Sequence, residues 1–293
     1  MPQRPIRRRT FLGAAAAPLA AAAEAALPSV ALGKYRVTRL IAGANPINGY
    51  SHCTQRLSEL MVQYFTVERT TQFLLDCERQ GINTWQSSYS PKAYQALAAA
   101  RDRGSKIQFI CLTSGKQDQY KKEILAMKPI AMVHHGGVTD TFFHEGKPEA
   151  VRDFLKRVHD MGIMAGMSTH NPKHLAHAED AAWETDLYMT CFYNVTRTPE
   201  EIRAMTGDRV LGELFLASDP QKMTERVRQV KKPCLGFKIL AAGRLCNNEA
   251  SVDRAFQFAY KNIKPSDAVI VGLYPVMFDE VAADVALAKK YAG

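Results

Sequence analysis

The chain has 293 residues, 46% of them hydrophobic, so it is long enough to bury one large core or two small ones. Its formal net charge is +9, but no long block of like charges follows the N-terminal region, which argues against nucleic-acid binding. The six cysteines stand singly without a C-x-x-C pair, which argues against a structural zinc site; a disulfide between Cys53 and Cys246 stays open.

Residues 1–31 have the layout of an export signal, with several arginines, then an alanine-rich middle and a small-residue end. The stretch RRTFLG, residues 8–13, resembles a twin-arginine signal. This resemblance implies export of the folded chain through the twin-arginine translocon, to the periplasm or otherwise outside the cytoplasm. The alternative is an amphipathic or disordered arm. With a cut after Ala31, residues 32–293 form the mature chain, in which no stretch is long enough to span a membrane.

Beyond the signal, apolar runs that suit strands alternate with segments of helical periodicity. Several of the helical segments begin at proline or end at glycine, and the strand-like runs are continuously apolar, which is typical of strands covered on both faces. We expect strands at 37–45, 83–89, 107–115, 130–137, 163–170, 187–195, 234–243 and 268–275. We expect helices at 66–81, 91–104, 117–128, 148–162, 172–184, 219–232, 249–264 and 278–293.

Eight strand–helix units in about 260 residues predict a single α/β domain over 32–293, folded as a (β/α)8 TIM barrel. A doubly wound open sheet is the alternative, although the phosphate-binding pattern G-x-G-x-x-G is absent. Residues 196–218, after the sixth strand, are longer than an ordinary connection and predict an insertion in the rim or a lid.

Polar side chains gather where the predicted strands end. In a barrel these ends form one rim, which is where TIM-barrel active sites lie. Because side chains alternate along a strand, only one of His134 and His135 should face the barrel axis. The other candidates at the strand ends are Asn45, Asn48, Gln86, Tyr89, Thr113, Ser168, His170, Asn171, Tyr193, Asn194, Lys238, Arg244 and Tyr274.

The order of these segments resembles the aldo/keto reductase superfamily over nearly the whole mature chain. The similar segments are LGKYRVTRLIAG, LLDCERQGINTWQSS, PIAMVHH, GMSTHNPKHLAHA and FKILAAGRL. The resemblance implies that His134 is the family's catalytic histidine and that Ser168 and Asn171 hold a nicotinamide amide. It also implies that the segment with Arg244 passes the cofactor's pyrophosphate, so NADP is a candidate cofactor. Gln86 stands where the family has its catalytic aspartate.

We assign catalytic roles to four residues. His134 is the expected general acid or base, since the ordinary histidine pKa lies near neutrality. Tyr89 and Lys238 are candidates for stabilising a reacting oxygen; Lys238 alternatively forms a Schiff base or simply reaches solvent. His170 is a second acid or base, a metal ligand, or a neighbour of a helix cap.

Neutral side chains suited to hydroxyl groups surround these candidates, which predicts a hydroxyl-rich ligand. Expected to bind it are Asn45, Asn48, Gln86, Tyr193, Asn194 and Tyr274. A divalent metal on His134 and His170, completed by His135 and His144, is less favoured because no acidic residue lies at a strand end.

The sequence therefore predicts an exported enzyme that acts on a sugar, polyol or keto-sugar by histidine-assisted proton transfer. Two alternatives remain open. One is an NADP-dependent aldo/keto oxidoreductase with a rewired acid group, and the other is a non-catalytic carbohydrate-binding barrel.

Overall fold

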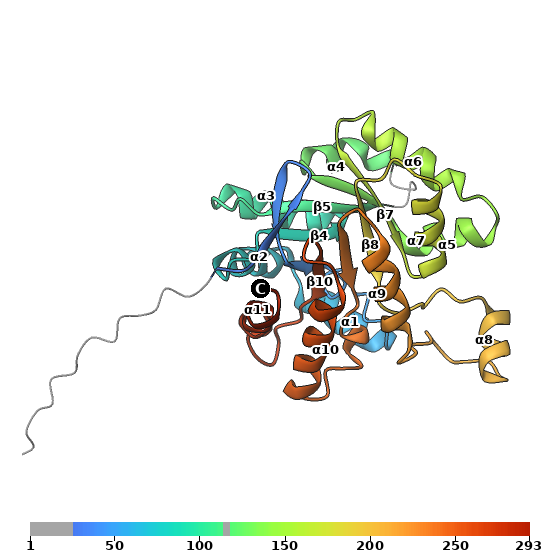
Figure 1. Cartoon of the computed structure of the whole chain (residues 1–293). Helices are drawn as coiled ribbons and strands as arrows, with labels where there is room; N and C mark the ends of the chain where they lie inside the picture. Colours follow the sequence, from blue (N-terminus) through green and yellow to red (C-terminus); the bar gives the residue numbers. More distant parts are fainter. Residues whose placement is uncertain (1–25, 114–117) are drawn as a thin grey trace, which may run out of the picture.

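Eight parallel strands form a closed barrel in the computed structural model, which describes residues 26–113 and 118–293 (Figure 1). The strands follow one another around the barrel in chain order, and β10 pairs with β3 to close it. This confirms the predicted TIM barrel, and each of the eight predicted strands overlaps one barrel strand. The strands are β3 Leu40–Gly43, β4 Thr84–Ser88, β5 Gln108–Thr113, β6 Ala131–His134, β7 Met164–Thr169, β8 Leu187–Cys191, β9 Cys234–Phe237 and β10 Ala268–Gly272.

Helices cover the outside of the barrel, as expected when strands are apolar on both faces. The predicted helices are α2 Val67–Arg79, α3 Pro91–Asp102, α4 Lys121–Ala126, α6 Glu149–His159, α7 Pro172–Asp180, α9 Asp219–Gln229, α10 Glu249–Asn262 and α11 Glu280–Tyr291. Two further helices and one short 3-10 turn were not expected from the sequence: α1 Gln55–Tyr64, α5 Gly136–His144 and η2 Ala241–Gly243. The 3-10 turn η1 Asp118–Tyr120 lies within the helix predicted over 117–128. None of the described helices is long and apolar enough to cross a bilayer.

The strand register brings the C-terminal ends of the strands to one rim. Gly43 pairs with Gly272 on one side and with Gln86 on the other, and Thr113 pairs with His134. Because all eight strands run in the same direction, residues just beyond these pairs meet at a single mouth.

An antiparallel hairpin covers the opposite, N-terminal end of the barrel. It consists of β1 Ser29–Leu32 and β2 Tyr35–Thr38. Leu32 and Val37 pack into the cluster that fills the barrel interior. The side-chain amide of Asn83 accepts a hydrogen bond from the Thr38 backbone N–H and donates to the backbone of the same hairpin, which fixes the hairpin beneath β4.

The strand predicted over 37–45 is therefore two strands, β2 and β3, that meet at Arg39. The buried Arg39 guanidinium donates to the backbone oxygens of Asp267, 2.9 Å from Nε, and of Ala292, 2.5 Å from Nη1. These bonds hold the chain where it turns from the hairpin into the barrel, and they compensate for burial of a charged group.

The hairpin places the start of the folded domain before residue 29. Leu27 is buried and β1 starts at Ser29, so the domain boundary placed after Ala31 falls inside β1. The arginine pair of the predicted signal lies in residues 1–25, outside the described residues.

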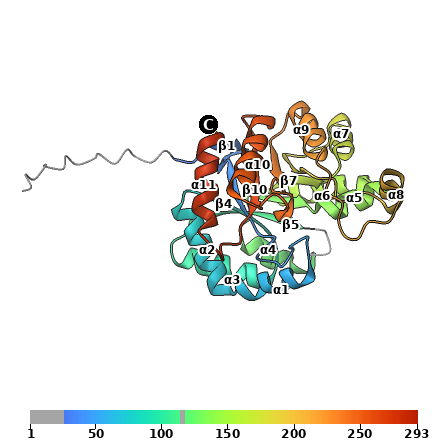
Figure 2. The same cartoon turned by 90° about the horizontal axis from the view of Figure 1, so that it is seen from below.

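The insertion after β8 carries a helix, α8 Pro199–Thr206, which projects from one side of the barrel in both views (Figures 1 and 2). Thr198 begins this helix with a capping box that includes Glu201, and Gly207 ends it in the left-handed conformation. The chain then returns to the barrel mouth, where Glu213 lines the cavity, as expected for a segment of the rim.

Candidate active site

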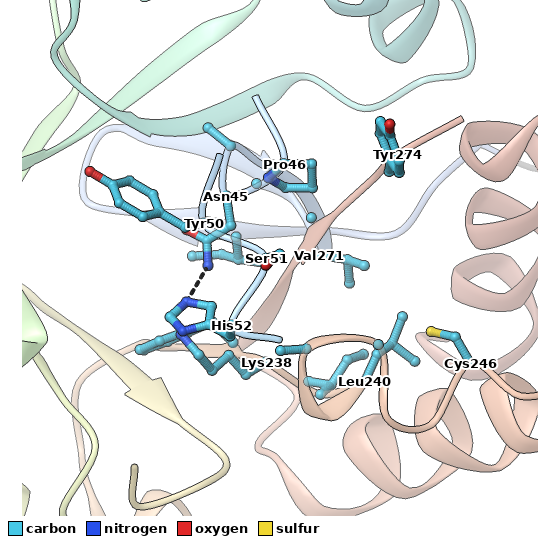
Figure 3. A pocket seen from close by; sticks show the side chains of 18 of the residues that line it. Asn45, Pro46, Tyr50, Ser51, His52, Lys238, Leu240, Cys246, Val271 and Tyr274 are labelled. Carbon is cyan, nitrogen blue, oxygen red and sulfur yellow. Dashed lines mark hydrogen bonds between the residues drawn. The ribbon is translucent and has the colours of Figure 1, made fainter. Parts of the chain in front are cut away.

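A cavity of about 1500 Å³ opens at the C-terminal end of the barrel and continues toward α10 and α11. We call the part lined by His135, His170 and Lys238 the histidine end, and the part lined by Glu280 and Asp284 the acidic end. In Figure 3, His52 and Lys238 lie on one side of the view and Cys246, from the loop after η2, lies on the other.

A fully buried aspartate from α5 organises the histidine end. Asp140 Oδ2 lies 2.8 Å from His170 Nδ1, and Asp140 Oδ1 lies 2.8 Å from His174 Nδ1. The carboxylate also accepts hydrogen bonds from the hydroxyls of Thr169 and Thr196 and from the His170 backbone N–H. Burial by itself raises the pKa of Asp140, but the bonds from His170 and His174 hold it below its usual range. Asp140 is therefore an ionised, fixed acceptor.

This carboxylate fixes the tautomer of His170. A carboxylate only accepts hydrogen bonds, so Nδ1 of His170 carries the proton and Nε2 keeps a lone pair. The His170 side chain lines the cavity, and no described residue bonds to Nε2. Burial lowers the pKa of His170, and the bond to Asp140 only partly opposes that effect, so the neutral ring is favoured. The result is an oriented base that faces the cavity.

Gly136 allows α5 to begin close to this base. A Cβ at Gly136 would lie 2.9 Å from Ser168 Oγ and 3.0 Å from His170 Cε1, closer than real Cβ atoms tolerate. Gly136 and Gly137, which the sequence suggested as a turn, are the first residues of a helix that packs against β7. That helix places Asp140 within hydrogen-bond distance of His170.

The two histidines at the end of β6 face opposite sides. Val133 belongs to the interior cluster, so by alternation His135 also turns inward and lines the cavity, whereas His134 turns toward the helices. His134 Nδ1 lies 2.7 Å from Thr139 Oγ1, and its ring packs against Phe154. Burial lowers the pKa of both histidines to about 4. The position predicted for His134, at the mouth of the barrel, is occupied by His135.

Lys238 follows β9 and supplies positive charge to the histidine end. Its backbone has a φ of 57°, a left-handed conformation that costs a non-glycine residue of the order of 1–3 kcal/mol. The ammonium acts electrostatically on His135, His170 and Glu213 and lies 5.4 Å from the centroid of the Phe237 ring. Within the described part of the chain its side chain forms no hydrogen bond. Strain at a cavity-lining residue is a recognised property of functional sites.

A second carboxylate–histidine pair closes the rim. His52 Nδ1 lies 2.8 Å from Glu213 Oε1, and His52 Nε2 lies 3.3 Å from the side-chain amide of Asn45 (Figure 3). Burial raises the pKa of Glu213, but the bond from His52 outweighs it and the net pKa is lowered. This pair ties the insertion after β8 to the loop after β3.

The structure brings part of the predicted site together. The predicted residues that line the cavity are Asn45, Asn48, Gln86, Ser168, His170, Lys238 and Tyr274. The predicted residues that do not line it are Tyr89, Thr113, His134, Asn171, Tyr193, Asn194 and Arg244.

The tyrosines outside the cavity have aromatic partners. The ring of Tyr89 lies 4.8 Å from that of Tyr120, and the buried ring of Tyr193 lies 5.1 Å from that of Phe215. Neither phenol is therefore in position to stabilise a reacting oxygen in this cavity.

The polar residues outside the cavity have structural partners. Asn171 caps α7, accepting from the Lys173 N–H, and Arg244 stacks 3.9 Å from the centroid of the Phe215 ring while it donates to the His52 backbone oxygen. Asn194 takes part in the turn that leads into the insertion, where its N–H donates to Asp219. Cys53 and Cys246 both line the cavity as free thiols and do not form the disulfide left open by the sequence.

Sequence reasoning missed Asp140, His52, Glu213 and the carboxylates of the acidic end. Asp140 was overlooked because α5 was not expected, and without that helix no acidic residue reaches the strand ends. One signal was present, since Asp140 is the only acidic residue between positions 131 and 144.

No group of three histidine, cysteine, aspartate or glutamate side chains is arranged to hold a metal ion among the described residues. Of the metal ligands considered from the sequence, His134 faces the helices and His144 Nε2 lies 3.1 Å from the Thr196 backbone oxygen.

The residues of the cavity do not fit NADP. Basic side chains, typically an arginine, accommodate the 2′-phosphate of NADP. The lysines and arginines that line the cavity in the described part of the chain are Lys238 and Arg254, and Arg254 acts on the neighbouring Asp253. Ser168 is the only one of the three predicted cofactor-binding residues on the cavity wall. We therefore derive no chemical step through a nicotinamide.

Solved structures share this fold at low sequence identity. Glycerol dehydrogenase AKR11B4 from Gluconobacter oxydans is 9% identical, with 90% of this chain and 89% of that chain covered and a TM-score of 0.50. Aldo-keto reductase AKR11C1 from Bacillus halodurans is 12% identical, with 90% and 91% covered and a TM-score of 0.50. A dihydropteroate synthase from Xanthomonas albilineans is 10% identical, with 91% and 97% covered and a TM-score of 0.53.

These similarities establish the barrel and nothing finer, because one fold hosts many activities. No protein-family profile matches the chain, and no curated protein matches it in sequence.

Proposed function

We propose that the chain is an exported barrel enzyme that transfers a proton on a small hydroxylated carbonyl compound, of the keto-sugar class, with His170 as the base. The observation that carries this proposal is the Asp140–His170 pair, in which a buried carboxylate holds Nδ1, no described residue bonds to Nε2, and the residue lines the cavity. A carboxylate that orients a histidine and stabilises its protonated form is the arrangement by which enzymes make histidine an efficient base.

The proposed step breaks a C–H bond next to the substrate carbonyl. His170 Nε2 takes the proton, and the electron pair moves through the carbon–carbon bond onto the carbonyl oxygen, giving an enediolate. Asp140 stabilises the imidazolium through Nδ1, and the Lys238 ammonium stabilises the developing oxyanion. An isomerisation is completed when the hydroxyl proton passes from one oxygen of the enediolate to the other and His170 returns its proton to the adjacent carbon. Return of the proton to the same carbon completes an exchange.

The proposed substrate class follows from the wall of the cavity. Asn45, Asn48 and Gln86 present neutral amides, which pair with hydroxyl groups as donors and as acceptors. Tyr274 adds an aromatic wall, held at 5.4 Å from the ring of Tyr64. Such a combination of amides and an aromatic ring suits a molecule with several hydroxyls and an apolar face.

The test is deuterium exchange in heavy water. The purified protein is incubated with dihydroxyacetone, D-fructose and D-glucose, and loss of the proton signal beside the carbonyl is followed by nuclear magnetic resonance. We expect exchange with at least one of them, and we expect His170→Gln to lower its rate by about 10²–10⁴-fold. The matched control is His134→Gln, which changes a histidine outside the cavity and should retain the rate. Ligand binding without exchange, or equal rates for the two variants, contradicts the proposal.

Export remains part of the proposal and rests on the RRTFLG stretch. Because Leu27 is buried and β1 begins at Ser29, we place the cleavage before Leu27 rather than after Ala31. Mass spectrometry of the N-terminus of the exported protein should show that residues 27–31 are retained. A mature chain that begins at Leu32 contradicts this placement.

A further inference from the structure

The acidic end of the cavity contains a buried carboxyl group with no partner. Asp284 lies on α11, its residue is 6% exposed, and it lines the cavity. In the chain as described, no donor forms a hydrogen bond with the Asp284 carboxyl group, although buried carboxyls are otherwise paired or hydrogen-bonded. A polar group in this state, on the wall of a cavity, is open to a hydrogen-bonding or charged ligand.

None of the described groups that interact electrostatically with Asp284 is positively charged. Glu280 lies one helical turn earlier on α11 and also lines the cavity; its Oε2 accepts a hydrogen bond of 2.6 Å from the Tyr274 N–H. Tyr260 on α10 and Cys246 in the loop after η2 are the other titratable groups that interact electrostatically with Asp284. None of the three is a base, and the charge of Glu280 disfavours the charged form of the aspartate.

The electrostatics follow from burial and from this set of neighbours. Burial, followed by repulsion from Glu280, raises the pKa of Asp284 to about 8, and burial raises that of Glu280. The protein alone thus keeps Asp284 protonated at neutral pH. A positive charge placed between the two carboxyls would favour loss of that proton and would supply the missing partner.

We propose that the acidic end binds a cationic organic group, a primary ammonium or a guanidinium, between the carboxylates of Asp284 and Glu280. An organic cation fits better than a metal ion for two reasons. Two carboxylates supply at most about four of the six to eight oxygens that Ca²⁺ takes. The surrounding wall contains the apolar side chains of Val252, Ala283 and Leu287, which offer no hydrogen bonds to the waters that Mg²⁺ keeps. The proposal does not depend on the chemistry at the histidine end.

The test uses 1,4-diaminobutane as the probe, with 1,4-butanediol as its uncharged counterpart. Calorimetric titrations of the full chain at pH 7, in two buffers of different ionisation enthalpy, measure affinity and proton release together. We expect the diamine to bind with release of a proton from Asp284, and the diol to bind at least about tenfold more weakly.

Two variants assign the site. Asp284→Asn should weaken diamine binding at least about tenfold and abolish the proton release, with the fold verified by circular dichroism. The matched control is Glu249→Gln, which removes an exposed carboxylate that also lines this end of the cavity, and it should bind within about twofold of the unchanged protein. His170→Gln should bind the diamine normally, which separates this site from the proposed catalytic one.

Three results overturn the proposal. The first is that the diamine does not bind at about 10 mM, a concentration that even a weak specific site reaches. The second is that diol and diamine bind equally well. The third is that Glu249→Gln loses as much affinity as Asp284→Asn, which would show that general negative charge, and not a built site, attracts the probe.

Discussion

Two buried aspartates, Asp284 on the wall of the cavity and Asp140 behind it, differ in the direction of their pKa shifts. Asp140 accepts hydrogen bonds from two histidines and two threonines, and its pKa is lowered despite burial. Asp284 is nearly as buried, has an acidic neighbour in place of donors, and its pKa is raised to about 8. Burial is common to both, so the partners decide the charge. The protein itself supplies the donors that Asp140 needs, whereas we propose that a cationic ligand supplies the partner of Asp284.

The largest effect should come from removing the paired aspartate. Asp140→Ala leaves His170 and His174 without their acceptor, so we expect the free energy of unfolding to fall by about 3–5 kcal/mol at pH 7. Urea denaturation followed by circular dichroism measures it. Because the folded-state pKa of Asp140 is depressed, its stabilisation is present above the unfolded-state pKa and is lost as pH falls below about 4. A loss below about 1 kcal/mol at pH 7 would show that the histidines find other acceptors.

The unpaired aspartate should behave in the opposite way. Below about pH 4 Asp284 is protonated in both states and costs nothing; between about pH 4 and pH 8 only the unfolded state ionises, so its cost to stability grows with pH. We expect Asp284→Asn to become more stable relative to the unchanged protein as pH rises, by up to about 1.4 kcal/mol per pH unit. Thermal unfolding at pH 5, 6.5 and 8 measures the difference. A difference that is constant with pH contradicts the raised pKa.

A smaller loss of stability should follow from displacing His170 than from removing its partner Asp140. Gly136→Ala places a Cβ against Ser168 and His170, so we expect a loss of about 1–3 kcal/mol in unfolding free energy and a displaced His170 ring. Gly137→Ala is the matched control, since its Cβ would lie at an ordinary 3.4 Å from the nearest atom, His135 Cε1. Urea denaturation of both variants compares them. Equal losses would mean that helix geometry, and not the close approach to His170, requires these glycines.

The smallest effect on the proposed exchange reaction should come from His134. Its ring contacts Thr139 and Phe154 outside the cavity, so His134→Gln should cost about 1 kcal/mol of stability through the altered hydrogen bond and change the exchange rate by less than about threefold. Exchange rates measured beside those of His170→Gln make the comparison. If His134→Gln lost as much exchange activity as His170→Gln, the result would support the original prediction that His134 is catalytic.

The fold was accessible from sequence because both faces of each barrel strand are covered, which leaves eight apolar runs that alternate with amphipathic helices. The hairpin was missed because β1 falls largely within residues 1–31, which were assigned to an export signal, and because β2 runs directly into β3. The bonds of Arg39 to the backbone near the far end of the chain hold the turn between β2 and β3. Such long-range bonds leave no local pattern.

The site was accessible only in part, for a related reason. The strand ends identified His170 and Lys238, but β6 is apolar on both faces, so nothing in its pattern distinguishes the inward His135 from the outward His134. Asp140 was hidden because it reaches His170 through a helix whose first residues are glycines, a pair that normally predicts a turn.

The most direct test of the account is the protonation state of His170 in solution. Nitrogen-15 spectra of histidine-labelled protein at pH 7, with His170→Gln used to assign the signal, report which ring nitrogen carries the proton. We predict a neutral ring with the proton on Nδ1 and a lone pair on Nε2, and we predict that Asp140→Asn disturbs this signal while Asp284→Asn leaves it unchanged. A ring protonated on Nε2 alone, or on both nitrogens, would contradict the claim that Asp140 prepares His170 as a base.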